Sequence, residues 1–146
     1  MKEGELIKEF MKVKKAHWRR CHDEFKKLEI SKGQPKILDY LVEHDGSIQK
    51  DIAKNCNIEA ATVTSILSIM EKVGFVERRP NKDDRRIINV YLTEKGRRVQ
   101  VNSQKVISQI ERDCFSDFNE EEMKQLKNFF ERMYNNLNKD GEKKND

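Results

Sequence analysis

The chain has 146 residues, enough for one domain with a buried core and helical extensions. Charged residues make up 38% and hydrophobic residues 36%, with 2 Pro and 6 Gly, which favours long exposed helices over extensive β structure. The net charge of +4 is small, and Met1–Glu5 lacks a signal-peptide pattern. No apolar run approaches the ~18 residues of a membrane helix. We therefore expect a soluble, cytoplasmic protein, in which any nucleic-acid surface depends on local clustering of basic residues.

A long amphipathic helix is predicted over about Glu5–Glu29. Apolar and small residues recur at three- and four-residue steps along it: Leu6, Phe10, Val13, His17, Cys21, Phe25 and Leu28. This stripe is too long for a small core to cover, so part of it should face another subunit. Ser31-Lys32-Gly33 breaks the helix, and Pro35 suits the first position of the next one. The second helix is expected to bury Ile37, Leu38, Leu41 and Val42.

Two short helices joined by a brief turn around Asn57 form a predicted helix-turn-helix. Ser47 is expected to cap the first of them, which turns Ile48, Ile52, Ala53 and Cys56 inward. The second runs from Ile58 to Val73 and buries Val63, Leu67 and Met70. Its other faces carry small residues that let a backbone approach a groove closely: Ala60, Ala61, Thr62, Thr64, Ser65 and Ser68.

A basic hairpin is predicted to follow this helix. Gly74 supplies a left-handed stop, and strands are expected over Phe75–Arg79 and Ile87–Leu92. Around the turn between them lie five basic residues and two acidic ones: Arg78, Arg79, Lys82, Arg85, Arg86, Asp83 and Asp84. A helix can fill the major groove of DNA while a cationic loop reaches an adjacent narrow groove, so the stretch Ile58–Thr93 suits duplex binding.

Two long helices are predicted at the C-terminal end. Thr93 should cap the first, which carries Val99, Val106, Ile110 and Cys114 on one face. Asn119 with Glu122 forms a capping box, flanked by a hydrophobic staple of Phe118 and Met123. A heptad-like seam then follows that requires a partner helix: Met123, Leu126, Phe130, Met133 and Leu137.

The predicted elements divide one structural domain into four regions. Residues 1–30 form an N-terminal dimerisation helix, and 31–96 form the winged helix-turn-helix lobe. Residues 97–138 form the C-terminal dimerisation helices, and 139–146 form a charged, flexible tail. The predicted fold class is therefore mainly α with a small β-hairpin wing.

Several motifs, in this order and spacing, resemble the MarR family of winged-helix transcription regulators. They are Gly33-Gln34-Pro35-Lys36-Ile37-Leu38, Ala61-Thr62-Val63-Thr64, Met70-Glu71-Lys72-Val73-Gly74-Phe75-Val76, Asp84-Arg85-Arg86 and Leu92-Thr93-Glu94-Lys95-Gly96. The resemblance implies a homodimer knitted together by its first and last two helices, with two lobes on a pseudo-palindromic DNA operator. It also implies control of nearby genes, usually by repression that a small ligand or an oxidant relieves.

By position, the family's major-groove contacts fall on Ala60, Ala61, Thr62, Thr64 and Ser65, with Ser68 further along the same helix. Its wing contact falls on Arg86, held by Asp84, with Arg85 nearby for phosphate. The chain departs from the family pattern at Glu59, where a Ser-like cap is common, and at Ala60, Ala61 and Ser65, where polar or basic residues are common. The helix therefore has no arginine to bond guanine. Few base-specific contacts are therefore expected from the helix. The wing and the phosphate contacts should supply much of the affinity, which should fall steeply as the salt concentration rises.

The first helix carries residues that could form a metal site or an oxidant-sensing thiol, or could serve only in packing. His17 and Cys21, four residues apart, could share a metal ion. A site needs three or four ligands, however, and only His44 and Glu24 are conceivable additions. Cys21 could instead sense oxidants, although a reactive thiolate needs a cationic setting and an interior helical cysteine usually just packs. We expect reduced thiols and no bound cofactor or metal.

Family members hold small phenolic compounds between the dimer helices and the DNA-binding lobe. Four aromatic residues could line such an effector cleft or serve as ordinary core and interface: Phe10, Trp18, Phe25 and Tyr40. The chain has no phosphate loop, no G-x-S-x-G motif and no supported carboxylate or Cys/His constellation, so we do not expect an enzyme. A winged-helix protein-interaction module that binds no DNA is the remaining alternative, which the basic wing disfavours.

Overall fold

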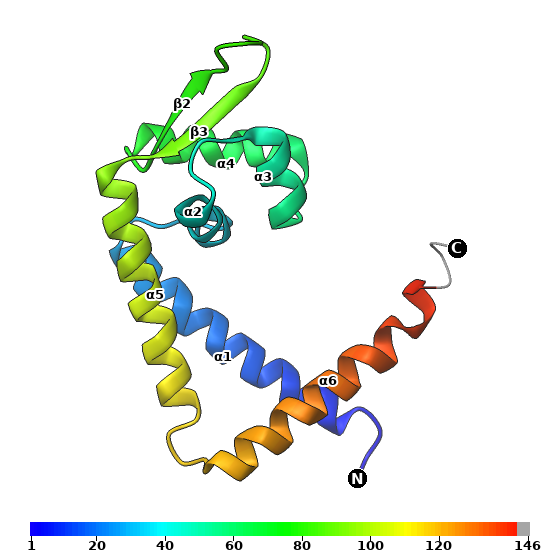
Figure 1. The fold of residues 1–146 in the computed structure, drawn as a ribbon. Coiled ribbons are helices and arrows are strands. Elements are labelled where there is room, and N and C mark those ends of the chain that lie inside the picture. Colours follow the sequence, from blue (N-terminus) through cyan, green and yellow to red (C-terminus); the bar gives the residue numbers. More distant parts are fainter. Residues whose placement is uncertain (143–146) are drawn as a thin grey trace. The chain divides into compact units, whose positions relative to one another are not determined.

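The computed structural model describes residues 1–142, which form six helices and a three-stranded antiparallel sheet (Figure 1). The elements are α1 (Glu5–Lys27), α2 (Gln34–Glu43), β1 (Ser47–Ile48), α3 (Gln49–Cys56), α4 (Ala60–Lys72), β2 (Val76–Pro80), β3 (Ile88–Leu92), α5 (Glu94–Cys114) and α6 (Glu120–Glu142). One compact unit covers residues 1–110, and a second begins at Glu111. The predicted mainly-α fold with a hairpin wing is confirmed. Among the described residues, no helix combines the length and apolarity needed to cross a membrane.

The core of the first unit joins α2, α3, α4 and the sheet. Its buried apolar side chains are Ile30, Ile37, Leu38, Leu41, Ile52, Cys56, Val63, Leu67, Met70, Phe75, Val76, Val90, Leu92 and Val99. The stripes predicted for α3 and α4 are thus confirmed at Ile52, Cys56 and the three α4 residues. Val42 was wrongly predicted to be buried, since 38% of it is exposed beyond the core-facing side of α2.

The sheet contains one strand that the sequence did not predict. Its order is β1-β3-β2, and Ser47 pairs with Val90 while Ile48 pairs with Asn89. Ser47 therefore does not cap α3, as we had expected. Ile48 occupies the N-cap position without a side-chain bond, and the Ser47 hydroxyl donates to the carbonyl of His44 instead.

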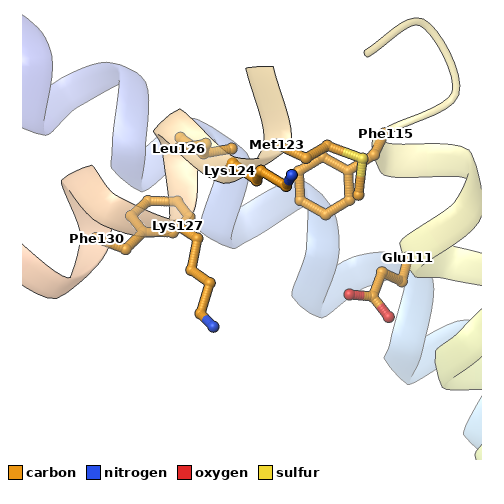
Figure 2. A pocket seen from close by; sticks show the side chains of 7 residues that line it. All are labelled: Glu111, Phe115, Met123, Lys124, Leu126, Lys127 and Phe130. Atoms are coloured by element: carbon orange, nitrogen blue, oxygen red, sulfur yellow. The ribbon is translucent and has the colours of Figure 1, made fainter. Parts of the chain in front are cut away.

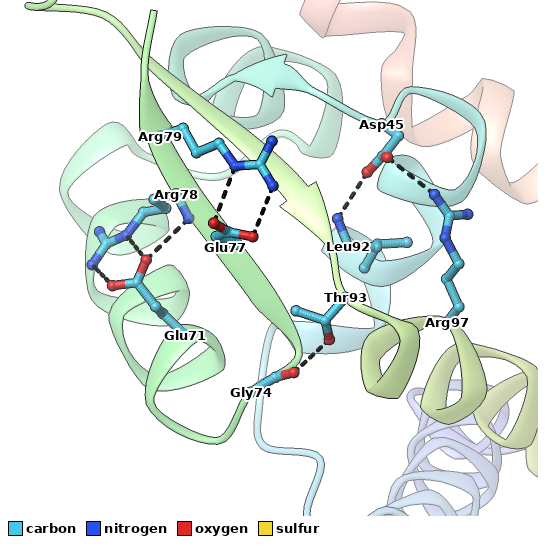
Figure 3. A network of polar contacts seen from close by, with 9 residues as sticks. All are labelled: Asp45, Glu71, Gly74, Glu77, Arg78, Arg79, Leu92, Thr93 and Arg97. Atoms are coloured by element: carbon cyan, nitrogen blue, oxygen red, sulfur yellow. Dashed lines mark hydrogen bonds and ion pairs between the residues drawn. The ribbon is translucent and has the colours of Figure 1, made fainter.

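A tight joint connects the hairpin to α5. The Thr93 hydroxyl oxygen accepts the backbone N–H of Gly96 at 3.0 Å, which confirms the predicted cap, and its proton goes to the carbonyl of Gly74 (Figure 3). A Cβ at position 96 would lie 2.0 Å from the Phe75 carbonyl oxygen. Only glycine allows this approach. The L-T-x-x-G motif therefore fixes the end of α4, through Gly74 and Phe75, against the start of α5.

The terminal helices leave much apolar surface exposed within their own units. α1, which is described throughout, buries none of its side chains, and its exposed apolar residues include Leu6, Ile7, Phe10, Met11, Val13 and Trp18. On α6 the exposed residues include Met123, Phe129, Phe130, Met133, Tyr134 and Leu137. The described parts of the predicted long stripes are therefore largely exposed within their own units.

The second unit confirms one local prediction and corrects two others. Glu122 accepts the backbone N–H of Asn119 at 3.1 Å and donates its own backbone N–H to the Asn119 side chain at 2.8 Å, which is the predicted capping box. Cys114, predicted to share the packed apolar face of the helix with Ile110, is exposed because it falls at the last turn of α5. α6 continues to Glu142, beyond the predicted start of the tail at residue 139. The rest of that predicted tail, 143–146, lies outside the described residues.

An apolar cavity of about 420 Å³ lies in the second unit (Figure 2). Phe115, Met123, Leu126 and Phe130 supply its apolar lining, and Glu111, Lys124 and Lys127 supply polar groups. Three of its apolar residues, Met123, Leu126 and Phe130, belong to the predicted helix seam.

Candidate nucleic-acid interface

The outward face of α4 carries the residues predicted to meet a major groove. All six are exposed: Ala60, Ala61, Thr62, Thr64, Ser65 and Ser68. The opposite face is anchored by Val63, Leu67 and Met70, each 0% exposed. The helix is thus fixed in the core by one side and presents a surface of methyls and hydroxyls on the other.

Most hydroxyls on this face are already hydrogen-bonded. Thr64, Ser65 and Ser68 each donate to the carbonyl four residues earlier, at 3.1, 3.2 and 2.9 Å. The Thr64 hydroxyl also accepts the Gln49 side-chain amide at 3.3 Å, a contact from α3 that the sequence did not indicate. Thr62 differs from the others, because its hydroxyl has no such bond within the described chain. It is the hydroxyl most free to meet a base or a phosphate.

The wing tip presents an arginine held by its predicted carboxylate. Arg86 donates to Asp84 through Nε at 3.0 Å and through Nη2 at 3.0 Å, and its backbone N–H reaches the same group at 3.1 Å. The Arg86 side chain is 91% exposed and that of Asp84 is 35% exposed. The hydrogen bonds from Arg86 hold the pKa of the Asp84 carboxyl below its usual value. The pair therefore stays ionised and oriented while projecting into solvent.

Two asparagines support the turn beneath this pair. The Asn81 side-chain oxygen accepts the backbone N–H groups of Asp83 and Asp84 at 2.9 and 3.1 Å. Asn81 also donates to Asn89 at 2.9 Å, and Asn89 donates to the Gly46 carbonyl at 2.7 Å. A side-chain oxygen that bonds backbone two residues on is the usual role of Asn at a turn, and this signal was available in the sequence.

Three of the five basic residues of the hairpin are paired with acidic side chains. Arg78 pairs with Glu71, Arg79 pairs with Glu77 and Arg86 pairs with Asp84 (Figure 3 shows the first two). Lys82 and Arg85 are exposed, and neither forms an ion pair within the described residues. The wing cations that form no ion pair among the described residues, Lys82 and Arg85, thus lie at the tip. The Arg78–Glu71 pair joins two different elements, so no local sequence pattern predicted it.

Two of the four aromatic residues predicted for an effector cleft share a cavity. Trp18 and Phe25 line a space of about 570 Å³ together with other residues of α1, its connection to α2 and the start of α2: Cys21, His22, Lys26, Ile30, Ser31, Lys32, Gly33 and Pro35. Phe10 and Tyr40 do not line it. Tyr40 instead stacks on His44 and accepts a bond from Asn55. Sequence reasoning missed the lining residues between the two helices because they lie in an irregular connection.

The candidate sensing residues do not assemble a metal site. Cys21 Sγ lies 3.7 Å from His17 Nε2. Within residues 1–142, however, no group of three His, Cys, Asp or Glu side chains comes together, and Glu24 pairs with Lys27. Burial raises the pKa of the Cys21 thiol, which opposes the thiolate that oxidant sensing requires.

A helix-turn-helix whose second helix is exposed on one side, followed by a hairpin with a projecting arginine, is the arrangement of a winged helix-turn-helix protein. Residues 30–88, from the end of the first helix to the return strand, match the MarR family. The chain belongs to the MarR family and is a DNA-binding transcriptional regulator.

Three relatives illustrate this similarity. YdgJ of Bacillus subtilis, an HTH-type transcriptional regulator, is 34% identical over 75% of this chain and 66% of its own length. YetL of the same organism, an HTH-type transcriptional repressor, is 36% identical over 47% of this chain and 42% of its own length. A mutant of S. aureus MepR, solved bound to an oligodeoxyribonucleotide, is 27% identical with a TM-score of 0.62, and the match covers 88% of this chain and 94% of that one.

Proposed function

We propose that this regulator represses transcription as a homodimer on a pseudo-palindromic operator. Each protomer places α4 in the major groove and the β2–β3 wing in the adjacent minor groove. The observation that carries the proposal is the Arg86 side chain, 91% exposed at the wing tip while its fork is held by Asp84. An arginine inserted into a narrow minor groove meets a strongly negative potential.

The start of α4 supports close approach to DNA. Its N-cap residue, Glu59, makes no side-chain capping bond, so the first backbone N–H groups of the helix remain available. Such groups bind phosphate well. Ala60 and Ala61 add little bulk there, and their methyls can contact thymine methyls. This surface favours positioning over base-specific hydrogen bonding.

The exposed stripes of α1 and α6 support the homodimer. Contiguous exposed apolar surface on a water-soluble chain usually marks a protein interface. A second copy would cover these stripes and also the α6 residues that line the cavity in Figure 2. Two-fold symmetry then presents two lobes to half-sites about one helical turn apart.

Repression is supported by the relationship to YetL, and the cavity at Trp18 and Phe25 supports relief by a small effector. Lys26 and Lys32 line the same cavity, so an aromatic acid suits it better than a neutral aromatic compound. We take 2-hydroxybenzoate as the probe. It should weaken DNA binding by the wild-type protein and have less effect on Trp18→Ala, and equal effects on both would contradict this cavity as the effector site.

Selection of duplexes from a random-sequence pool tests the DNA-binding proposal. The wild-type protein should enrich an inverted repeat with half-sites about 10 base pairs apart. Sedimentation should show a dimer at micromolar concentration, both free and on the selected duplex. Enrichment of no sequence, or a monomer under both conditions, would contradict the proposal.

A further inference from the structure

One arginine at the base of the wing is bound to the recognition helix. Arg78 of β2 donates to Glu71 of α4 through its backbone N–H at 3.0 Å, through Nε at 3.4 Å and through Nη2 at 3.2 Å (Figure 3). Nη2 also donates to the Ser68 hydroxyl at 3.3 Å. That hydroxyl in turn donates to the Thr64 carbonyl at 2.9 Å. These contacts connect the last turns of α4 to the first strand of the hairpin.

Arg78 is a poor candidate for a phosphate contact. Its side chain is 22% exposed, against 91% for Arg86. Its charge is balanced by the Glu71 carboxylate, whose pKa the Arg78 hydrogen bonds hold below the usual range. A paired, half-buried guanidinium has few donors left for DNA.

We propose that Arg78, Glu71 and Ser68 form a clamp that fixes the wing relative to α4, and that Arg78 is a positioning residue for DNA binding. This inference rests on the proposed function, because it assumes that both elements contact one duplex. It also changes the interpretation of Ser68, which serves the clamp through its hydroxyl instead of contacting a base.

The clamp matters because helix and wing bind neighbouring grooves together. When two contacts are joined rigidly, the second binds at a high effective concentration, and a loose joint lowers that concentration. The connection between α4 and β2 consists of Val73, Gly74 and Phe75, and Gly74 has a φ of +85°. The polar bridge supplies a restraint across this short turn.

Glu71→Gln gives the sharpest test, because two interpretations predict opposite signs. Removing an acid near DNA should strengthen binding if only net charge matters. Loss of the clamp should instead weaken binding to the selected duplex by about tenfold. Glu77→Gln is the matched control: it removes the same charge from the neighbouring strand β2, but Glu77 bonds Arg79 and not α4. It should bind as the wild type does or more tightly.

Arg78→Lys separates positioning from charge. A lysine keeps the positive charge but cannot span Glu71 and Ser68 with a planar fork. Its affinity should therefore fall about as far as that of Glu71→Gln, and the dependence of log K on log salt should keep the wild-type slope. A phosphate contact predicts near-normal affinity for Arg78→Lys and a smaller slope for Arg78→Gln. The double variant Glu71→Gln/Arg78→Gln should bind no more weakly than Arg78→Gln alone.

Thermal melting of each variant provides the folding control. Weakened binding by folded Glu71→Gln and Arg78→Lys, with an unchanged salt slope, supports the clamp. Tighter or unchanged binding by Glu71→Gln overturns the clamp. If Arg86→Ala loses binding in the same titration, the proposed function still holds. A wild-type protein that binds no duplex overturns both.

Discussion

Helix α4 and the wing tip offer DNA two different surfaces. On the outward face of α4 the polar side-chain groups are hydroxyls, and three of them already donate to backbone carbonyls. At the wing tip Arg86 is charged, almost fully exposed and oriented by Asp84. A hydroxyl that must give up its donated bond in order to donate to DNA gains little, whereas a preoriented guanidinium loses little freedom on binding. The wing should therefore supply more affinity than the helix.

Loss of the Arg86 side chain should have the largest effect. Arg86→Ala should weaken binding to the selected duplex well over tenfold, because it removes the one cation that the wing tip holds in a fixed pose among the described residues. Gel-shift titration measures this, with sedimentation to show that the dimer persists. Arg85→Ala is the matched control, since it removes an adjacent exposed cation that pairs with no carboxylate in the described chain. Equal losses of affinity from the two variants would mean that the wing contributes only general positive charge and that the orientation of Arg86 does not matter.

Asp84→Asn should have an intermediate effect. The substitution leaves Arg86 charged but weakens the bidentate pairing that orients it, while also removing a negative charge near DNA. We expect about a threefold to tenfold loss of affinity. The same gel-shift titration measures it, and tighter binding would mean that charge outweighs orientation at the wing tip.

Thr62→Val should have a smaller effect. The change keeps the shape of the side chain and removes the one α4 hydroxyl that lacks a bond within the described chain. A loss of about threefold is expected on the selected duplex, and less on a scrambled duplex. A loss larger than that of Arg86→Ala would reverse the ranking of helix and wing.

The smallest effect should be that of pH on the wing pair. The Arg86 hydrogen bonds lower the pKa of Asp84, so the stabilisation they provide is present above the unfolded pKa and is lost only as the pH falls through the lower folded value. Binding should therefore show no change from this pair between about pH 5 and about pH 8. A loss of affinity in that range that disappears in Asp84→Asn would contradict this assignment.

Local sequence signals predicted much of this molecule. The Asn119–Glu122 box, the stop at Gly74 and the Asp84–Arg86 turn each depend on residues within a few positions, and the structure confirms their geometry. The helix periodicity likewise located the buried face of α4. Contact of these groups with DNA stays a prediction.

Interactions between distant segments were not predictable in the same way. β1 has only two residues, and its strand character depends on pairing with Val90 and Asn89, more than forty positions away. Arg78 was counted among the basic residues of the wing, and its pairing was not predicted because its partner Glu71 belongs to a different element. Cys114 and Val42 followed apolar stripes that extend beyond the part of each helix covered by the core.

Methylation interference on the selected duplex tests most directly whether the wing and α4 occupy different grooves. Dimethyl sulfate marks guanine N7 in the major groove and adenine N3 in the minor groove, so one experiment reports on both. We predict that N3 methylation blocks binding where the wings lie and N7 methylation blocks it within each half-site, and that Arg86→Ala abolishes only the N3 effect. Interference confined to N7 positions, unchanged in Arg86→Ala, would contradict a wing that anchors the protein in the minor groove.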